Sequence, residues 1–98
     1  MNRTSVIIKL SEMACCLGAI ATGTEWHLFG SVDRNEPSPS DIDLMIFCLN
    51  DNQADELRNA IDFDIFEIPL HISFFTYEEA KSINVVFMQN STLIIKPD

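Results

Sequence analysis

Two aspartates, Asp41 and Asp43, open a segment that is otherwise apolar, Asp-Ile-Asp-Leu-Met-Ile-Phe. In a β-strand, side chains at positions i and i+2 point to one face, roughly 6–7 Å apart. Carboxylates held in this way repel each other, and a hard cation between them offsets that repulsion. Mg²⁺ takes oxygen ligands and commonly uses one or two carboxylates together with substrate phosphates. The pair therefore predicts a Mg²⁺ site formed by Asp41 and Asp43.

A Gly-Ser dipeptide, Gly30-Ser31, precedes this pair and directly follows a predicted strand. Glycine lets the backbone approach a ligand closely, and free amides with a hydroxyl group can hold a phosphate. Alone, each motif also fits an ordinary turn or a solvated strand start. Together they favour a site for a nucleoside triphosphate, because phosphoryl and nucleotidyl transfer depend mainly on positioning and charge stabilisation.

Hydrophobic periodicity and turn residues predict the elements that must hold these side chains. Alternation places Ile42, Leu44, Ile46 and Cys48 on one face of a strand, opposite the two aspartates. The predicted order is α-β-β-α-β-α-(β), which indicates one α+β domain over residues 1–98, a small mixed β-sheet with flanking helices. The predicted segments are helix 4–21, strand 25–29, a polar loop 30–40, strand 41–49, helix 51–60, a strand region 65–76 broken near its start by Pro69, helix 77–83 and apolar runs 85–88 and 93–95.

Composition excludes several classes of protein. The chain has 98 residues, of which 47% are hydrophobic, so a packed core is expected and a disordered chain is not. Its formal net charge of −9 repels a phosphate backbone, and we therefore expect no extended nucleic-acid surface. The three cysteines are odd in number and two are adjacent, which favours buried, reduced thiols over a disulfide framework.

An N-terminal membrane or secretory signal is the remaining structural alternative. Arg3 and the apolar stretch 13–21 imitate one. Lys9 and Glu12 interrupt the apolar region, however, and its apolar residues recur at the three- and four-residue spacing of an amphipathic helix. We therefore expect a cytoplasmic domain that does not cross a membrane.

The loop and the second strand together resemble a known family signature. The chain reads Gly-Ser-Val-Asp-Arg-Asn-Glu, then, after a short loop, Ser-Asp-Ile-Asp-Leu. This is similar to the signature of the minimal nucleotidyltransferases of the DNA polymerase beta-like superfamily, GS-x-A-R-G-E followed by S-D-I-D-L. Asn35 stands where the family usually has glycine, and Asn also tolerates the left-handed conformation. The order of elements extends the resemblance over about residues 10–75.

The resemblance implies a nucleotidyltransferase-like fold and transfer of a nucleoside monophosphate, often AMP from Mg²⁺-bound ATP. It implies that Asp41 and Asp43 hold the metal and that the nucleotide contacts Gly30, Ser31, Arg34 and Ser40. Family members usually carry a third acidic residue on a later strand, and here His71 stands at that position. An imidazole can act as a general base near neutral pH but is a poor Mg²⁺ ligand. A shifted alignment would offer Asp64 or Glu67 instead.

The acceptor is left open by the sequence, as are the nucleobase and the oligomeric state, a homo-oligomer included. A chain this short leaves little surface for its own acceptor-recognition domain, so we expect a protein acceptor. Small members of the resembled family are often antitoxins paired with an all-helical HEPN-type toxin, and the resemblance implies such a partner. The alternative is a catalytically degenerate protein-binding module of the same fold, which the replacement of the third acid by His71 favours.

Overall fold

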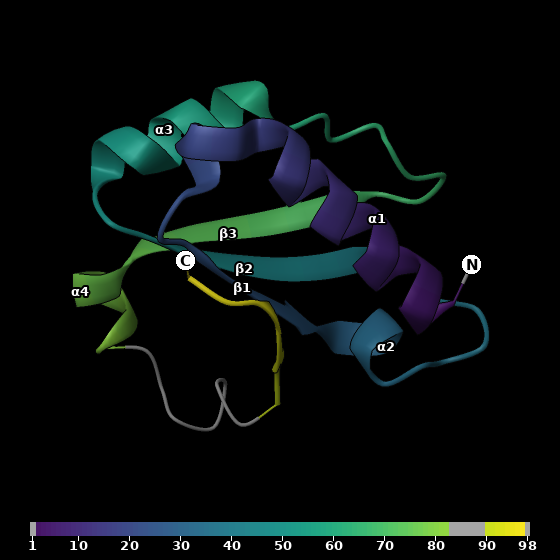
Figure 1. The fold of residues 1–98 in the computed structure, drawn as a ribbon. Helices are drawn as coiled ribbons and strands as arrows, with labels where there is room; N and C mark the ends of the chain where they lie inside the picture. Colours follow the sequence, from purple (N-terminus) through teal and green to yellow (C-terminus); the bar gives the residue numbers. More distant parts are fainter. Residues whose placement is uncertain (1, 83–89, 98) are drawn as a thin grey trace.

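The computed structural model describes residues 2–82 and 90–97 of the chain (Figure 1). Four strands form one sheet, and helices flank it. The predicted α+β class, with a small mixed sheet and flanking helices, is therefore confirmed. In chain order the elements are α1 (Arg3–Leu17), a 3₁₀ turn η1 (Gly18–Ala21), β1 (Glu25–Phe29), α2 (Gly30–Asp33), β2 (Ile42–Cys48), α3 (Asp51–Ala60), β3 (Leu70–Thr76), α4 (Tyr77–Ala80) and β4 (Thr92–Ile95).

The sheet has the strand order β3-β2-β1-β4. The central pair, β1 and β2, is antiparallel, β4 pairs antiparallel with β1, and β3 pairs parallel with β2. Parallel strands begin at the same edge of a sheet, and an antiparallel neighbour ends there. The end of β1 and the starts of β2 and β3 therefore meet at one edge, to which α2 is attached.

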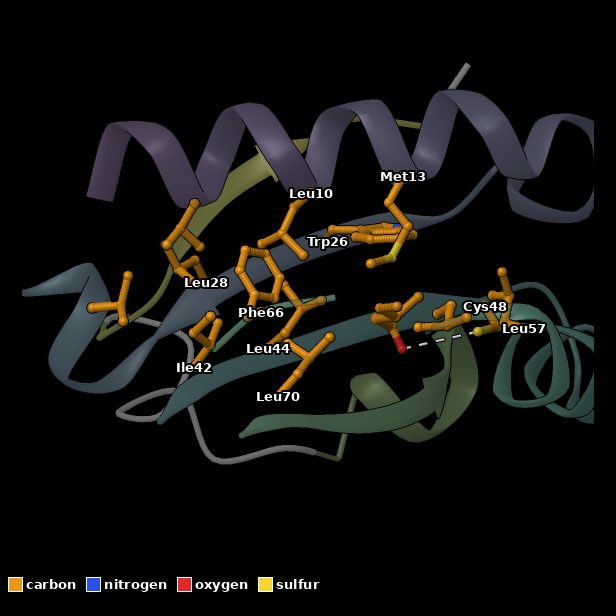
Figure 2. Packing of buried hydrophobic residues seen from close by; sticks show 14 of the residues in the cluster. Leu10, Met13, Trp26, Leu28, Ile42, Leu44, Cys48, Leu57, Phe66 and Leu70 are labelled. Carbon is orange, nitrogen blue, oxygen red and sulfur yellow. Dashed lines mark hydrogen bonds between the residues drawn. The ribbon is translucent and has the colours of Figure 1, made fainter. Parts of the chain in front are cut away.

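One face of the sheet carries the core, and α1 and α3 cover it (Figure 1). The inner face of α1 contributes Val6, Leu10 and Met13, which are buried. Leu10 and Met13 lie over Trp26 of β1 in Figure 2. Full burial of one such apolar side chain stabilises the fold by about 1.5–3 kcal/mol. The predicted face of β2 is confirmed, because Ile42, Leu44, Ile46 and Cys48 all belong to this core.

Local capping sets several element boundaries as the sequence predicts. The side chain of Asn50 accepts a hydrogen bond from the backbone of Gln53 and begins α3. Thr76 and Glu79 form a reciprocal capping box that begins α4. The strand 25–29 and the helix 51–60 have the predicted bounds.

Other boundaries differ from the predictions. The strand predicted from residue 65 begins only at Leu70, because Pro69 lacks an N–H for the ladder, although its carbonyl accepts from Ile42 N at 2.8 Å. The predicted first helix tightens into the 3₁₀ turn at Gly18, where φ is 58°. Residues Gly30–Asp33 form a helical turn where a loop was predicted. The helix predicted to residue 83 ends at Ala80, and the apolar run 85–88 lies outside the described residues.

Two features of the N-terminal helical segment bear on the expectations above. By length and composition alone, the helical stretch Arg3–Ala21 is apolar enough to cross a membrane. The core helix of a water-soluble domain meets the same criteria, so this feature is weak evidence for a membrane. The prediction of buried thiols is right for Cys48 and wrong for Cys15 and Cys16, which are exposed on α1.

Candidate functional site

Three polar side chains from neighbouring strands converge at the sheet edge where β2 and β3 begin. Asp41 directly precedes β2, Asp43 is the second residue of β2, and His71 is the second residue of β3. The parallel register pairs Asp43 with His71. Because the preceding pair, Ile42 and Leu70, points into the core, Asp43 and His71 point to the opposite face.

The geometry of this Asp41–Asp43–His71 cluster fits a bound cation. One ligand atom from each side chain lies within 4.8 Å of the other two. His71 Nδ1 is 3.8 Å from Asp41 Oδ2 and 3.8 Å from Asp43 Oδ1. These separations exceed hydrogen-bond length, and the imidazole is 62% exposed. The cluster is therefore open to solvent on the His71 side. Its three potential ligand atoms lie close enough together to bind one ion.

The electrostatics of the cluster centre on Asp43. Its pKa is raised above the ordinary 3.8, mainly because burial desolvates the carboxylate and also because Asp41 carries charge beside it and hydrogen-bonds to it. His71 and Arg34 lower the same pKa and offset part of the effect. Two close carboxylates that disfavour each other's charge are a setting that a cation relieves.

Gly30 makes the position of Asp43 possible. Its φ is +78°, a conformation that side chains rarely adopt, and an added Cβ would overlap the Asp43 carboxylate. The predicted role of this glycine was close approach of the backbone to a ligand. The structure shows close approach of this glycine to the aspartate, which follows because Phe29, the preceding residue, pairs with Asp43 in the β1–β2 ladder.

Ser31 follows in α2 and has an unusual environment. Its Oγ is buried and, among the residues that the structure describes, has no hydrogen-bond partner. A buried hydroxyl without a partner is costly and uncommon in folded proteins.

An ion pair that the sequence does not predict links this turn to α1, because Arg3 Nε lies 3.2 Å from Asp33 Oδ1. No local sequence signal links residues thirty positions apart.

The other predicted nucleotide contacts lie at the rim. Arg34 acts on Asp43 through its charge, but its side chain is exposed and bound to Glu36, with Nη2 2.7 Å from Oε2. Asn35 adopts the left-handed conformation, with φ 57°, as its place in the motif suggested. Ser40 is exposed beside Asp41. The structure thus brings Gly30, Asp41, Asp43 and His71 together and leaves Arg34 and Ser40 outside the cluster.

Asp64 and Glu67, the alternative sources of a third carboxylate, are exposed and precede β3. Within residues 2–82 and 90–97, the cluster of potential metal ligands contains neither of them. The β2–β3 register therefore makes His71 the third member. Neither protein-family models nor curated protein sequences give a match to this chain.

Proposed function

We propose that this chain is a minimal nucleotidyltransferase that moves a nucleoside monophosphate, AMP from ATP, to an acceptor. The observation that carries the proposal is the convergence of Asp41, Asp43 and His71 at a sheet edge beside Gly30-Ser31. The four-stranded mixed sheet with helices on one face is compatible with this family but is not specific to it. The signature of residues 30–44 is what directs the choice of reaction.

In the proposed reaction an oxygen nucleophile of the acceptor attacks the α-phosphorus of the triphosphate. The bond from that phosphorus to the bridging oxygen breaks, pyrophosphate leaves with the electron pair, and the hydroxyl proton passes to a base. A divalent cation, when bound, neutralises charge on the phosphates and the leaving group. The products are the nucleotidylated acceptor, pyrophosphate and the proton taken by the base.

The residues of the site supply positioning and charge. Asp41 and Asp43 would hold a divalent cation, Mg²⁺ by the resemblance, since two carboxylates beside substrate phosphates are a set that Mg²⁺ accepts. The orphaned Ser31 hydroxyl would donate to a phosphate oxygen, which would relieve its missing partner. His71 is the proposed base, because a neutral imidazole accepts a proton near neutral pH.

The proposed acceptor is a protein partner, in the manner of an antitoxin that modifies a HEPN-type toxin. The negative net charge of the chain argues against an acceptor bound along a nucleic-acid backbone. The open His71 side of the cluster supports access by a large acceptor, since the imidazole is mostly exposed.

A second candidate is a protein-binding module that keeps the outline of the site and lacks transfer activity. The observation that favours it is the imidazole at the third position, where the resembled family has a carboxylate. This candidate predicts no nucleotide binding with any divalent cation.

Calorimetry with ATP tests the proposal on the full chain. We expect ATP to bind only when a divalent cation is present, with Mg²⁺ and Mn²⁺ tried in parallel. Asp43→Asn should abolish this binding, because it removes the charge of the less exposed carboxylate of the cluster. Asp64→Asn is the control, since it removes an exposed carboxylate that is not part of the cluster, and it should bind ATP like the wild type.

Binding that disappears in Asp43→Asn alone would support the transferase and justify a search for the acceptor with α-labelled ATP. No binding at millimolar ATP with either cation would reject it and leave the binding module. Equal binding by both variants and the wild type would place the nucleotide elsewhere and also reject the proposed site.

A further inference from the structure

We propose that His71 is a direct metal ligand and that it makes this site prefer a divalent transition cation over Mg²⁺. Mn²⁺ is the transition cation used to test this preference. The inference rests on the part of the proposed function that assigns Asp41 and Asp43 as cation ligands. It changes the identity of the cation that the resemblance implies, because the donor set in this chain is two carboxylates and one imidazole.

Donor chemistry is the first argument. Mg²⁺ binds oxygen ligands and dehydrates reluctantly, so a neutral nitrogen donor adds little to its binding. Imidazole suits transition cations such as Fe²⁺, Ni²⁺ and Zn²⁺, and the affinities of first-row cations for nitrogen and oxygen sites rise from Mn²⁺ through Co²⁺ and Ni²⁺. Mn²⁺ shares the oxygen preference of Mg²⁺ more than the later cations do, so it is the most stringent probe of a contribution from the imidazole. Replacing a third carboxylate by imidazole also removes one negative charge, which weakens the attraction for Mg²⁺ more than for a cation that bonds to nitrogen.

Geometry is the second argument. The register of the parallel β2–β3 pair sets His71 directly opposite Asp43. Its Nδ1, the nitrogen near both carboxylates, is equidistant at 3.8 Å from Asp41 Oδ2 and Asp43 Oδ1. Two ligand atoms on one transition cation stand at most about 4.0–4.4 Å apart, the sum of two bonds of about 2.0–2.2 Å. Each histidine–aspartate separation is therefore within the span of a shared ion.

The surroundings of His71 are the third argument. A ring that was fixed by packing would be unable to adjust to an ion, but this side chain is 62% exposed at the start of an edge strand. Asp43, in contrast, is less exposed, and its carboxylate lies close to the backbone of Gly30. The site thus combines a half-buried carboxylate with an exposed imidazole. Coordination through Nδ1 replaces the base role given to His71 in the proposed function, because the neutral coordinated ring carries its proton on Nε2. The inference therefore keeps the cation site formed by Asp41 and Asp43 and drops His71 as the base.

Metal titrations without nucleotide or acceptor test the inference on the full chain. Free Mn²⁺ is followed by electron paramagnetic resonance, and Mg²⁺ affinity is obtained from its competition with Mn²⁺. The variants are His71→Ala, which removes the donor, and His71→Asp, which restores a third carboxylate. Ser73→Ala is the control, because Ser73 is exposed two residues further along the same face of β3. Thermal unfolding by circular dichroism checks that each variant folds.

We expect His71→Ala to weaken Mn²⁺ binding at least about tenfold, since the loss of even an indirect partner of a metal ligand costs that much. Mg²⁺ affinity should change far less, and His71→Asp should shift the preference toward Mg²⁺. Ser73→Ala should behave like the wild type.

An unchanged ratio of Mn²⁺ to Mg²⁺ affinity in His71→Ala would overturn the inference, as would the absence of Mn²⁺ binding to the wild type. These outcomes are separable from failure of the proposed function. If ATP binding depends on a cation but the ratio of Mn²⁺ to Mg²⁺ affinity is the same in His71→Ala, the transferase is retained and the ligand role of His71 is rejected. If that ratio changes in His71→Ala but the protein binds no ATP, the ligand role is retained and the transferase is rejected.

Discussion

The Cα of Gly30 lies directly against the carboxylate of Asp43, and no side chain fits between them. The end of β1 and the start of β2 are adjacent in the antiparallel ladder, so the glycine and the aspartate are forced together by strand pairing. The absence of a side chain at Gly30 leaves room for this carboxylate on the face of the sheet opposite the core. The Gly-Ser turn and the Asp-x-Asp pair are thus one structural unit.

Gly30→Ala should destabilise the protein by more than about 1–3 kcal/mol, the cost of a left-handed backbone at a residue with a side chain. The additional loss comes from the overlap of the new Cβ with Asp43. Urea unfolding measures the change in the free energy of unfolding.

Gly18→Ala is the matched control for this prediction. Gly18 also has a positive φ, +58°, but nothing lies within 4 Å of an added Cβ. It should show the backbone cost alone. Combining Gly30→Ala with Asp43→Ala should recover part of the loss, and equal destabilisation by Gly18→Ala and Gly30→Ala would contradict the contact.

Asp43→Asn should stabilise the metal-free protein at neutral pH. The folded-state pKa of Asp43 is raised above 3.8, mainly by burial and by Asp41, so the native state holds its proton more tightly than the unfolded state. That contribution to stability is fully present below about pH 3.8 and is lost as the pH rises through the raised pKa. In the presence of a chelator, the free energy of unfolding of Asp43→Asn should therefore exceed that of the wild type by an amount that grows between about pH 4 and pH 8. A variant less stable than the wild type at neutral pH would argue against this cause.

Ser31→Ala should leave stability unchanged or raise it by up to about 1 kcal/mol, because it removes a buried hydroxyl that has no partner. The same variant should weaken ATP binding if the hydroxyl donates to a phosphate.

Thr24→Val is the contrasting substitution, since Thr24 Oγ1 accepts from Trp26 Nε1 at 2.9 Å and donates to the Ala21 carbonyl at 2.6 Å. Thr24→Val should cost about 1–3 kcal/mol, because it leaves the buried Trp26 N–H without an acceptor. Chemical denaturation of both variants gives the comparison. Similar losses in the two would mean that Ser31 already has a partner in the folded protein.

Glu36→Gln should strengthen ATP binding by about fivefold or less, which corresponds to about 1 kcal/mol for an exposed ion pair. The carboxylate of Glu36 now holds the Arg34 guanidinium, and its removal would free that cation for a phosphate. Arg34→Gln should weaken binding by a similar factor. Calorimetry on both variants checks the prediction, and thermal unfolding should be nearly unchanged because the pair is exposed. Unchanged affinity in both would exclude Arg34 from the nucleotide site.

Much of the local structure could be read from the sequence, because it depends on neighbours along the chain. Alternation alone identifies the face of β2 that packs into the core and the opposite position of Asp43. The capping residues Asn50 and Thr76 begin their helices through hydrogen bonds within three residues. The Asp-x-Asp spacing by itself indicated a cation site.

Only the tertiary structure decided which residues complete that site. The parallel pairing of β2 with β3 puts His71, rather than Asp64 or Glu67, beside the aspartates. Strand register is set by packing between distant segments, and a shift of one residue would turn His71 to the core face. The contact of Gly30 with Asp43 and the unpartnered Ser31 hydroxyl have the same origin, since both arise where β1 and β2 meet, and neither leaves a pattern in the sequence.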